Sequence, residues 1–485
     1  MNKDGIKKNY IYNLTYQILN LILPLVTTPY ISKVLGPGNI GIYSYTYSFV
    51  STFVMVGSLG IATYGQREIA SVNDDKEEYS HRFWEIQVVK MLSVSLSMLF
   101  YLVFALCYKD YRIYFLIQIP YFLAAIFDIS WLFQGIEKFK YVALRNICVK
   151  LLSLALIFLL VKTKNDLPVY IMLLCISQFT GNITMWMHLR KYVYVSKVAV
   201  RDLKKHIKPT FMYFVPTISY QIHSVLDKAM LGVLYQDNAE NGYYEQAHKI
   251  VNMATMVISS YNIVMRSRMT ALFVQKKKKE FEVNFNNSLH FISMLVFPMS
   301  FGMAGIAANL VPWFLGIEYG KVTTLLLIFC PMFIIQGLRT CIGYNIITPT
   351  GMQSKGNIVQ VTSAITNVFL NAMLIPKYGA IGATVASVAA EGVVLIGYLH
   401  YTKEYVRLKN VIYVGYKYLA ASLVMFFALS VLSNKFDANI LDTFGLIMLG
   451  GIIYFVVLLL FRDEFFVTKM QQCIDRMLKR TRKQC

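Results

Sequence analysis

The chain has 485 residues, of which 56% are hydrophobic and 15% are charged, and its mean hydropathy is +0.50. Soluble domains carry about 25% charged residues, so this composition excludes an ordinary soluble protein and predicts an all-α polytopic membrane protein. The formal net charge is +21, which raises the question of nucleic-acid binding.

The first motif along the chain is GPGNIG at residues 36–41, which matches the G-x-G-x-x-G dinucleotide fingerprint. The fingerprint needs a preceding strand and an acidic residue about 20 positions later. The flank 9–32 instead holds 24 residues without a charged side chain, and the first acidic residue after the motif is Glu68. We therefore expect no dinucleotide site, but a tight turn at Gly36, Pro37 and Gly38 between two membrane helices.

Apolar stretches predict about fourteen membrane helices. Their approximate limits are 11–34, 41–65, 83–106, 113–134, 146–161, 168–188, 210–235, 243–265, 289–314, 322–346, 358–375, 380–401, 416–432 and 443–461. No cleavable signal peptide is expected, because the first apolar stretch is too long.

The distribution of Lys and Arg orients these helices. With a cytoplasmic N-terminus, the inside segments carry 35 basic residues and the outside turns carry 8. This bias predicts that both termini are cytoplasmic. Basic loops beside a membrane also account for the net charge, so no nucleic-acid partner is expected.

A weak internal repeat divides the chain. A shift of 201 residues aligns Gly41 with Gly242 and Tyr43 with Tyr244. Parallel repeats of this kind are a transporter plan. We expect an N-terminal lobe of six helices (1–190), a linker (191–209), a C-terminal lobe of six helices (210–401), two further helices (402–461) and a basic cytoplasmic tail (462–485).

Several blocks, in order, resemble a known family. They are LPLVTTPYISKVLGPGNIGIYSYTYSF, LGIATYGQREIA, FDISWLFQGIEKFKYVALRN, SVLDKAMLG with NGYYEQAHKI, and PKYGAIGATVAS. They are similar to the Wzx-type oligosaccharide-unit flippases of the multidrug/oligosaccharidyl-lipid/polysaccharide exporter superfamily.

The resemblance implies a MATE-like V-shaped pair of six-helix lobes that works by alternating access. Its cargo would be an oligosaccharide linked to polyprenyl pyrophosphate, moved from the inner to the outer leaflet of a bacterial cytoplasmic membrane for surface polysaccharide synthesis. A polysaccharide polymerase and a chain-length regulator would be partners of such a pathway.

Ionisable groups within spans are costly and are candidates for function. Cations would hold the pyrophosphate, and the candidates are Lys228, Arg339, Lys249 and Lys90. Acidic groups and a histidine would couple transport to ions or pair the lobes, and the candidates are Asp227, His223, Glu245, Asp128 and Glu391.

Structural roles compete at several of these positions. Glu245 and Lys249 stand i, i+4 and could form a surface pair, while Lys90 could extend to the inner interface. Asp128 could cap a helix or pair with the nearby EKFK segment.

Two other functions stay open within the superfamily, a cation-coupled drug antiporter and a lipid-linked peptidoglycan precursor flippase. An enzyme is not expected, since no outer turn exceeds about a dozen residues and no Walker A, H-E-x-x-H or G-x-S-x-G motif occurs. The seven cysteines lack C-x-x-C spacing, so no zinc site and no cofactor are expected.

Overall fold

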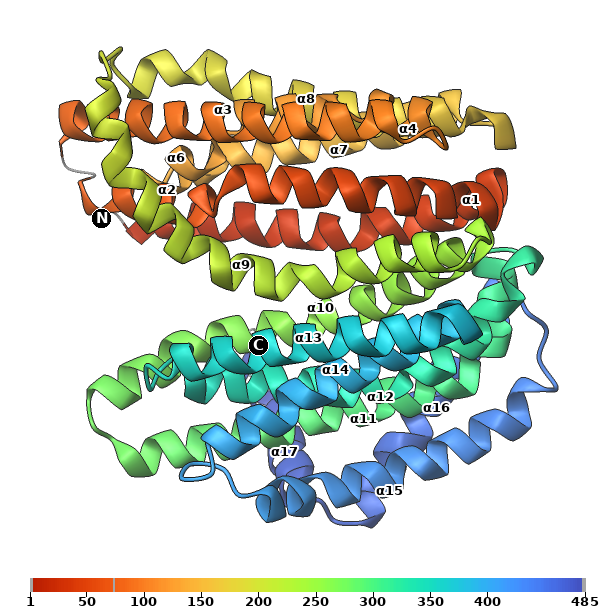
Figure 1. The fold of residues 1–485 in the computed structure, drawn as a ribbon. Coiled ribbons are helices and arrows are strands. Elements are labelled where there is room, and N and C mark those ends of the chain that lie inside the picture. The colour runs from red at the N-terminus through yellow and green to blue at the C-terminus, as the bar shows by residue number, and fades with distance from the viewer. Residues whose placement is uncertain (1–2, 73–74, 482–485) are drawn as a thin grey trace. The chain divides into compact units, whose positions relative to one another are not determined.

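The computed structural model describes residues 3–72 and 75–481. Some side chains within these ranges are not described, namely 3–18, 20–21, 139, 200, 215–224, 257, 259–260, 263–264, 473–474 and 476–481. The secondary structure of the described residues is helical and holds no strand, as an all-α membrane protein requires (Figure 1).

Contacts divide the chain into a first unit, residues 1–245, and a second unit, residues 246–485. The first unit holds α1 (Lys3–Ser58), α2 (Ile61–Ser71), α3 (Lys76–Cys107), α4 (Arg112–Ile117), α5 (Pro120–Phe127), α6 (Ser130–Gly135), α7 (Phe139–Leu160), η1 (Lys164–Asp166), α8 (Leu167–Tyr192), α9 (Val200–Leu234) and the start of α10 (Asn238–Val274). α9 packs against α1, α2 and α3. The predicted lobe limits at 190 and 210 stay a prediction.

α1 consists of two helices joined at a break. Gly36 has φ 74° and ψ 170°, a conformation almost restricted to glycine. Pro37 follows the break, where its missing N–H costs no helical hydrogen bond. A turn between two helices is thus confirmed, and its special backbone conformation lies at Gly36.

A second break interrupts the helix that the sequence predicts over 113–134. It separates α5 from α6 at residues 128–129 and frees backbone carbonyl groups, which side chains from neighbouring helices satisfy. The donors are Gln87 to Ile126 (2.7 Å), Trp186 to Phe127 (2.7 Å), Lys90 to Asp128 (2.6 Å) and Asn182 to Ala124 (2.6 Å). A break at membrane depth is tolerated only where protein groups satisfy the backbone in this way.

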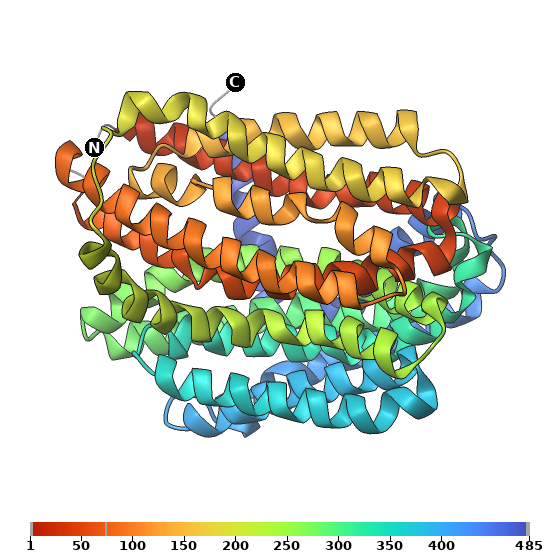
Figure 2. The same cartoon turned by 45° about the horizontal axis from the view of Figure 1, so that its top comes forward.

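The second unit holds the rest of α10, α11 (Lys278–Phe314), η2 (Ile317–Tyr319), α12 (Gly320–Ile342), the π-turn η3 (Gly343–Ile347), α13 (Gln353–Tyr378), α14 (Ala380–Tyr401), α15 (Leu408–Ser433), α16 (Ile440–Leu460) and α17 (Glu464–Thr481). α11 lies at its centre and packs against α12, α15 and α16. Figure 2 shows the helices of each unit running largely alongside one another.

Apolar surface on α3 shows how the helices meet a membrane. Six large apolar side chains on this helix are more than half exposed and share one broad face: Leu92, Leu96, Leu99, Phe100, Val103 and Leu106. Hydrocarbon chains cover such a face at no cost, whereas water does not.

Within the described residues, eleven stretches are long and apolar enough to cross a membrane. The first of them, Ile22–Ser71, contains the break at Gly36 and so takes in part of the predicted span 11–34 and all of 41–65. The predicted spans 210–235 and 243–265 lie on α9 and α10, which are not among the eleven. The protein is therefore a multi-pass membrane protein, and the number fourteen stays a prediction.

Candidate functional site

Three side chains from three helices meet in the first unit. The Lys228 ammonium on α9 pairs with the Glu245 carboxylate on α10 at 2.5 Å between Nζ and Oε2. The same oxygen accepts a hydrogen bond from the Ser44 hydroxyl of α1 at 3.2 Å. Both charged side chains are mostly buried, with exposed fractions of 16% and 20%. Glu245 thus joins α9 and α1 through one oxygen atom.

Asp227 faces a different neighbour from Lys228. Its carboxylate is buried and accepts a hydrogen bond from the Tyr244 hydroxyl at 2.5 Å. Successive residues of a helix point about 100° apart, so α9 presents an acid to Tyr244 and a base to Glu245. Both contacts hold α9 against the beginning of α10.

Beside this pair the backbones of α1 and α10 approach closely at four residues, which we call the glycine crossing: Pro37, Gly41, Asn238 and Gly242. A Cβ atom on Gly41 would overlap the carbonyl oxygen of Asn238, and one on Gly242 would overlap that of Pro37. Small residues permit such an approach. The contact is reciprocal, as at a two-fold interface, because the repeat offset of 201 relates Pro37 to Asn238 and Gly41 to Gly242.

Lys90 and Asp128 form a contact of their own in the first unit. Lys90 is 3% exposed and donates to the backbone oxygen of Asp128 at 2.6 Å, with the carboxylate at 3.9 Å. The Asp128 carboxylate accepts from the backbone N–H of Ser130 at 2.9 Å, at the start of α6. Lys90 therefore lies inside the protein at the helix break and not at an interface, and Asp128 accepts a backbone hydrogen bond at the start of α6, whose N-cap position is Ile129.

The second unit holds an ion pair between α12 and α14. The Arg339 Nε lies 2.7 Å from the Glu391 Oε2, and the two side chains are 9% and 16% exposed. The sequence predicts Arg339 as a residue that binds the headgroup and Glu391 as a residue that couples transport to an ion or pairs the lobes. The structure brings them together as partners.

The structure says less about two other predicted site residues, His223 and Lys249. The side chain of His223 lies outside the described part of α9. Lys249 is half-buried on α10, one turn beyond Glu245, and belongs to the second unit.

A buried network that the sequence did not predict centres on Glu85 of α3. This carboxylate is fully buried. Its Oε1 lies 2.8 Å from Lys205 Nζ and 3.1 Å from His81 Nε2, and its Oε2 lies 2.9 Å from His206 Nε2. The other ring nitrogen of His206 bonds to the Tyr64 hydroxyl at 2.7 Å. The sequence offers one signal for this network, the i, i+4 spacing of His81 and Glu85 at the start of the predicted span 83–106.

A cavity of about 290 Å³ opens in the first unit between α1, α2, α5 and α8. None of its lining residues is charged. The polar and aromatic ones are Tyr47, Ser51, Ser58, Thr63, Tyr121 and Gln178. The rings of Tyr47 and Tyr121 meet edge to face with centroids 5.2 Å apart. The cavity therefore offers hydroxyl groups, an amide and ring faces to a neutral polar molecule.

Comparison with solved structures identifies the fold. The chain matches a structure of the lipid II flippase MurJ in an inward closed conformation with a TM-score of 0.75. The match covers 94% of this chain and 99% of that one at 16% identity. An identity this low shows likeness of fold alone.

Curated relatives and a family model identify the family. An Escherichia coli (strain K12) protein named as an O-antigen transporter is 22% identical over 395 residues, covering 80% of this chain and 95% of its own. A glycan biosynthesis flippase, Agl15 of Haloferax volcanii, is 22% identical over 197 residues, covering 40% and 41%. The polysaccharide biosynthesis protein family model matches residues 6–268. The chain therefore belongs to the polysaccharide biosynthesis protein family.

Proposed function

We propose that this protein flips polyprenyl-pyrophosphate-linked oligosaccharide repeat units from the inner to the outer leaflet of a bacterial cytoplasmic membrane, by alternating access. The observation that carries this proposal is the match to a relative named as an O-antigen transporter over 80% of the chain, together with the family itself. The protein acts as a transporter and not as an enzyme.

The paired cations supply the chemistry for the headgroup. A pyrophosphate brings about two negative charges into a partly dehydrated site, where an isolated charge costs several kcal/mol. Lys228 and Arg339 each have a carboxylate partner. The headgroup takes the place of that carboxylate, so the cation never stands alone. Arg339 grips phosphate oxygens with its planar fork, while Lys228 acts as a mobile point charge.

The uncharged cavity suits the sugar part of the cargo. Its hydroxyl and amide groups can exchange hydrogen bonds with sugar hydroxyls, and Tyr47 and Tyr121 offer ring surface to the apolar face of a sugar. The lining holds no carboxylate or ammonium group, which favours a neutral sugar at this position.

The proposal places both termini in the cytoplasm, as the distribution of basic residues predicts. The product then reaches an outer-leaflet polymerase, with a chain-length regulator as a further partner. Lys249, His223 and Asp227 remain candidates for headgroup binding or for coupling to an ion.

Deletion of the gene tests this function. We expect lipid-linked repeat units to accumulate on the inner leaflet and surface polysaccharide to disappear, with restoration by the plasmid-borne gene. Normal surface polysaccharide with altered drug sensitivity would contradict the proposal and support an antiporter. Loss of peptidoglycan precursor transport would support a precursor flippase.

A further inference from the structure

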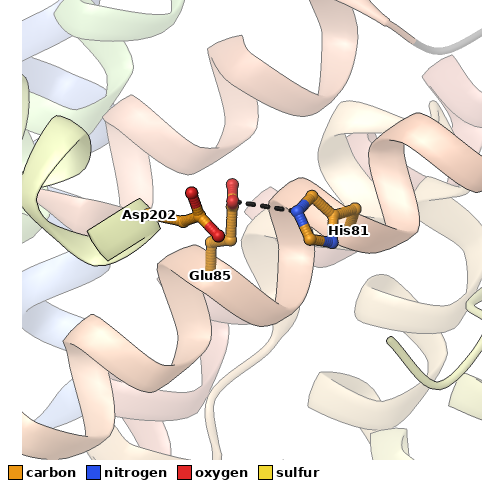
Figure 3. A group of neighbouring side chains, drawn as sticks. All are labelled: His81, Glu85 and Asp202. Atoms are coloured by element: carbon orange, nitrogen blue, oxygen red, sulfur yellow. Dashed lines mark ion pairs between the residues drawn. The ribbon is translucent and has the colours of Figure 1, made fainter. Parts of the chain in front are cut away.

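Three potential metal ligands come together where α9 begins. His81 and Glu85 lie one turn apart on α3, and Asp202 lies in the first turn of α9 (Figure 3). One ligand atom from each residue lies within 4.8 Å of the other two. His81 Nε2 and Glu85 Oε1 are 3.1 Å apart, which is close to the spacing of two ligands on one zinc ion.

Neighbouring residues hold two of these ligands in the orientation that metal binding needs. The Nδ1 of His81 bonds to the Ser196 hydroxyl at 2.7 Å, which leaves Nε2 directed at Glu85. The Oε2 of Glu85 bonds to His206 Nε2 at 2.9 Å, so that Oε1 is the oxygen that faces His81 and Lys205. Ligating histidines and carboxylates in proteins are held by such outer hydrogen bonds.

Charge at the cluster also favours a cation. Asp202 is half-buried, and its carboxylate has no hydrogen-bond or ion-pair partner among the side chains that the structure describes. Its position in the first turn of α9 gives it a weak helix-dipole interaction only. Two carboxylates this close repel each other unless a positive charge lies between them.

Lys205 now supplies part of that charge, with Nζ 2.8 Å from Glu85 Oε1. Its side chain is 54% exposed, so the long chain can turn out to solvent without burying an unpaired group. A divalent ion would replace one ammonium charge with two and would contact Asp202 as well.

We propose that His81, Glu85 and Asp202 bind a Zn²⁺ ion, with Lys205 as the competing cation. One imidazole and two carboxylates suit Zn²⁺, whereas Mg²⁺ prefers oxygen ligands alone. The sequence alone gave no such site, because its metal expectation rested on cysteine spacing. The ion would fasten the beginning of α9 to α3, and this inference does not depend on the transported cargo.

Zinc binding to the full-length protein in lipid nanodiscs tests the proposal, by equilibrium dialysis and elemental analysis at neutral pH. We expect one Zn²⁺ per chain, and loss of that ion in His81→Ala and in Asp202→Asn. Ser196→Ala removes only the orienting hydrogen bond, so the affinity should fall by roughly 10-fold to 100-fold. His188→Ala is the matched control, since His188 lies exposed on α8 beside Tyr141 and should bind as wild type does.

Lys205→Met gives the sharpest contrast. If the lysine competes with the metal, its removal should raise the Zn²⁺ affinity, while a purely structural ion pair would give only a less stable protein. Size-exclusion profiles of all variants establish that they remain folded. Absence of bound Zn²⁺ in wild type, equal stoichiometry in wild type and His81→Ala, or unchanged affinity in Lys205→Met would each overturn the proposal.

Discussion

Ser44 and Glu245 lie 201 positions apart, and their side chains share a hydrogen bond of 3.2 Å. This is the offset that aligns the two halves of the sequence, so equivalent positions of the repeat touch each other. The same offset relates the two contacts of the glycine crossing to each other, because Gly41 against Asn238 becomes Gly242 against Pro37 when each residue is exchanged for its equivalent in the other half. Lys228 contacts the same oxygen of Glu245, so a ligand that draws Lys228 away breaks one of the contacts of that oxygen and keeps the one from Ser44.

The first prediction concerns Lys228. Lys228→Ala should lower the rate of flipping by at least roughly tenfold, since a hydrogen bond to a charged group contributes about 1.5–3 kcal/mol. The protein level and the membrane insertion should not change. Flipping in vesicles, normalised to the amount of protein, measures the effect.

Glu245→Gln separates a headgroup role for Lys228 from a purely structural one. This variant keeps the cation and removes only its acidic partner. If Lys228 binds the headgroup, Glu245→Gln should retain most of the activity. Equal loss in Lys228→Ala and Glu245→Gln would show that the ion pair itself is what matters.

The glycine crossing gives a second prediction, with a control in the same turn. Gly41→Ala places a Cβ against the backbone oxygen of Asn238, and overpacking of this kind typically costs 1–3 kcal/mol. The temperature of unfolding in detergent should therefore fall. Gly38→Ala should leave it unchanged, because no atom lies within 4 Å of a Cβ at that position. Equal unfolding temperatures for the two variants would contradict the close approach.

Much of the fold is predictable from the sequence, because hydropathy reports burial in a membrane directly. The break at Gly36 is predictable as well, since glycine and proline there exclude a continuous helix. The break between α5 and α6 is not, because no glycine or proline marks residues 128–129. Its stability comes from side chains on other helices, such as Gln87 and Trp186, which no local pattern shows.

The candidate site is predictable as a list of residues but not as a set of partners. The ionisable groups that stand out in apolar stretches of the sequence are Asp227, Lys228, Glu245, Arg339 and Glu391. The pairing of Arg339 with Glu391 depends on the packing of α12 on α14, which brings together residues 52 positions apart. Glu85 is not predicted from the sequence, because it lies near the end of a predicted span. A charge at such a position costs little free energy and does not by itself indicate a function.

Arg339 gives a third prediction. Arg339→Ala should abolish flipping, and Arg339→Lys should restore it only partly, because a lysine lacks the planar fork. Glu391→Gln, which keeps the arginine, is the partner control and should retain more activity than Arg339→Ala. Full activity of Arg339→Lys would show that headgroup binding does not need the planar guanidinium group.

Lys90 gives a fourth prediction, in which stability falls more than transport. Lys90→Met leaves the backbone oxygen of Asp128 without its donor, at a cost of about 1–3 kcal/mol. The unfolding temperature of the purified protein should drop, while the activity per folded molecule should stay within roughly threefold of wild type. A stable but inactive Lys90→Met protein would instead indicate that Lys90 binds the headgroup.

The orientation in the membrane gives a fifth prediction. Reporter fusions after Lys377 and at the C-terminus should report the outside and the inside, respectively, because 35 basic residues lie in the predicted inner segments and 8 in the outer turns. Fusions that report the same side would contradict the predicted topology.

The proposed function requires that this chain by itself moves a lipid-linked oligosaccharide across a membrane. Its most direct test is reconstitution of the purified protein in vesicles that carry a polyprenyl-pyrophosphate oligosaccharide in the inner leaflet only, followed by detection of outer-leaflet sugar with a membrane-impermeant lectin or glycosidase. We predict that outer-leaflet sugar rises with time in vesicles with wild-type protein, rises at least roughly tenfold more slowly with Lys228→Ala, and does not rise without protein. Equal exposure in protein-free and wild-type vesicles would contradict the account.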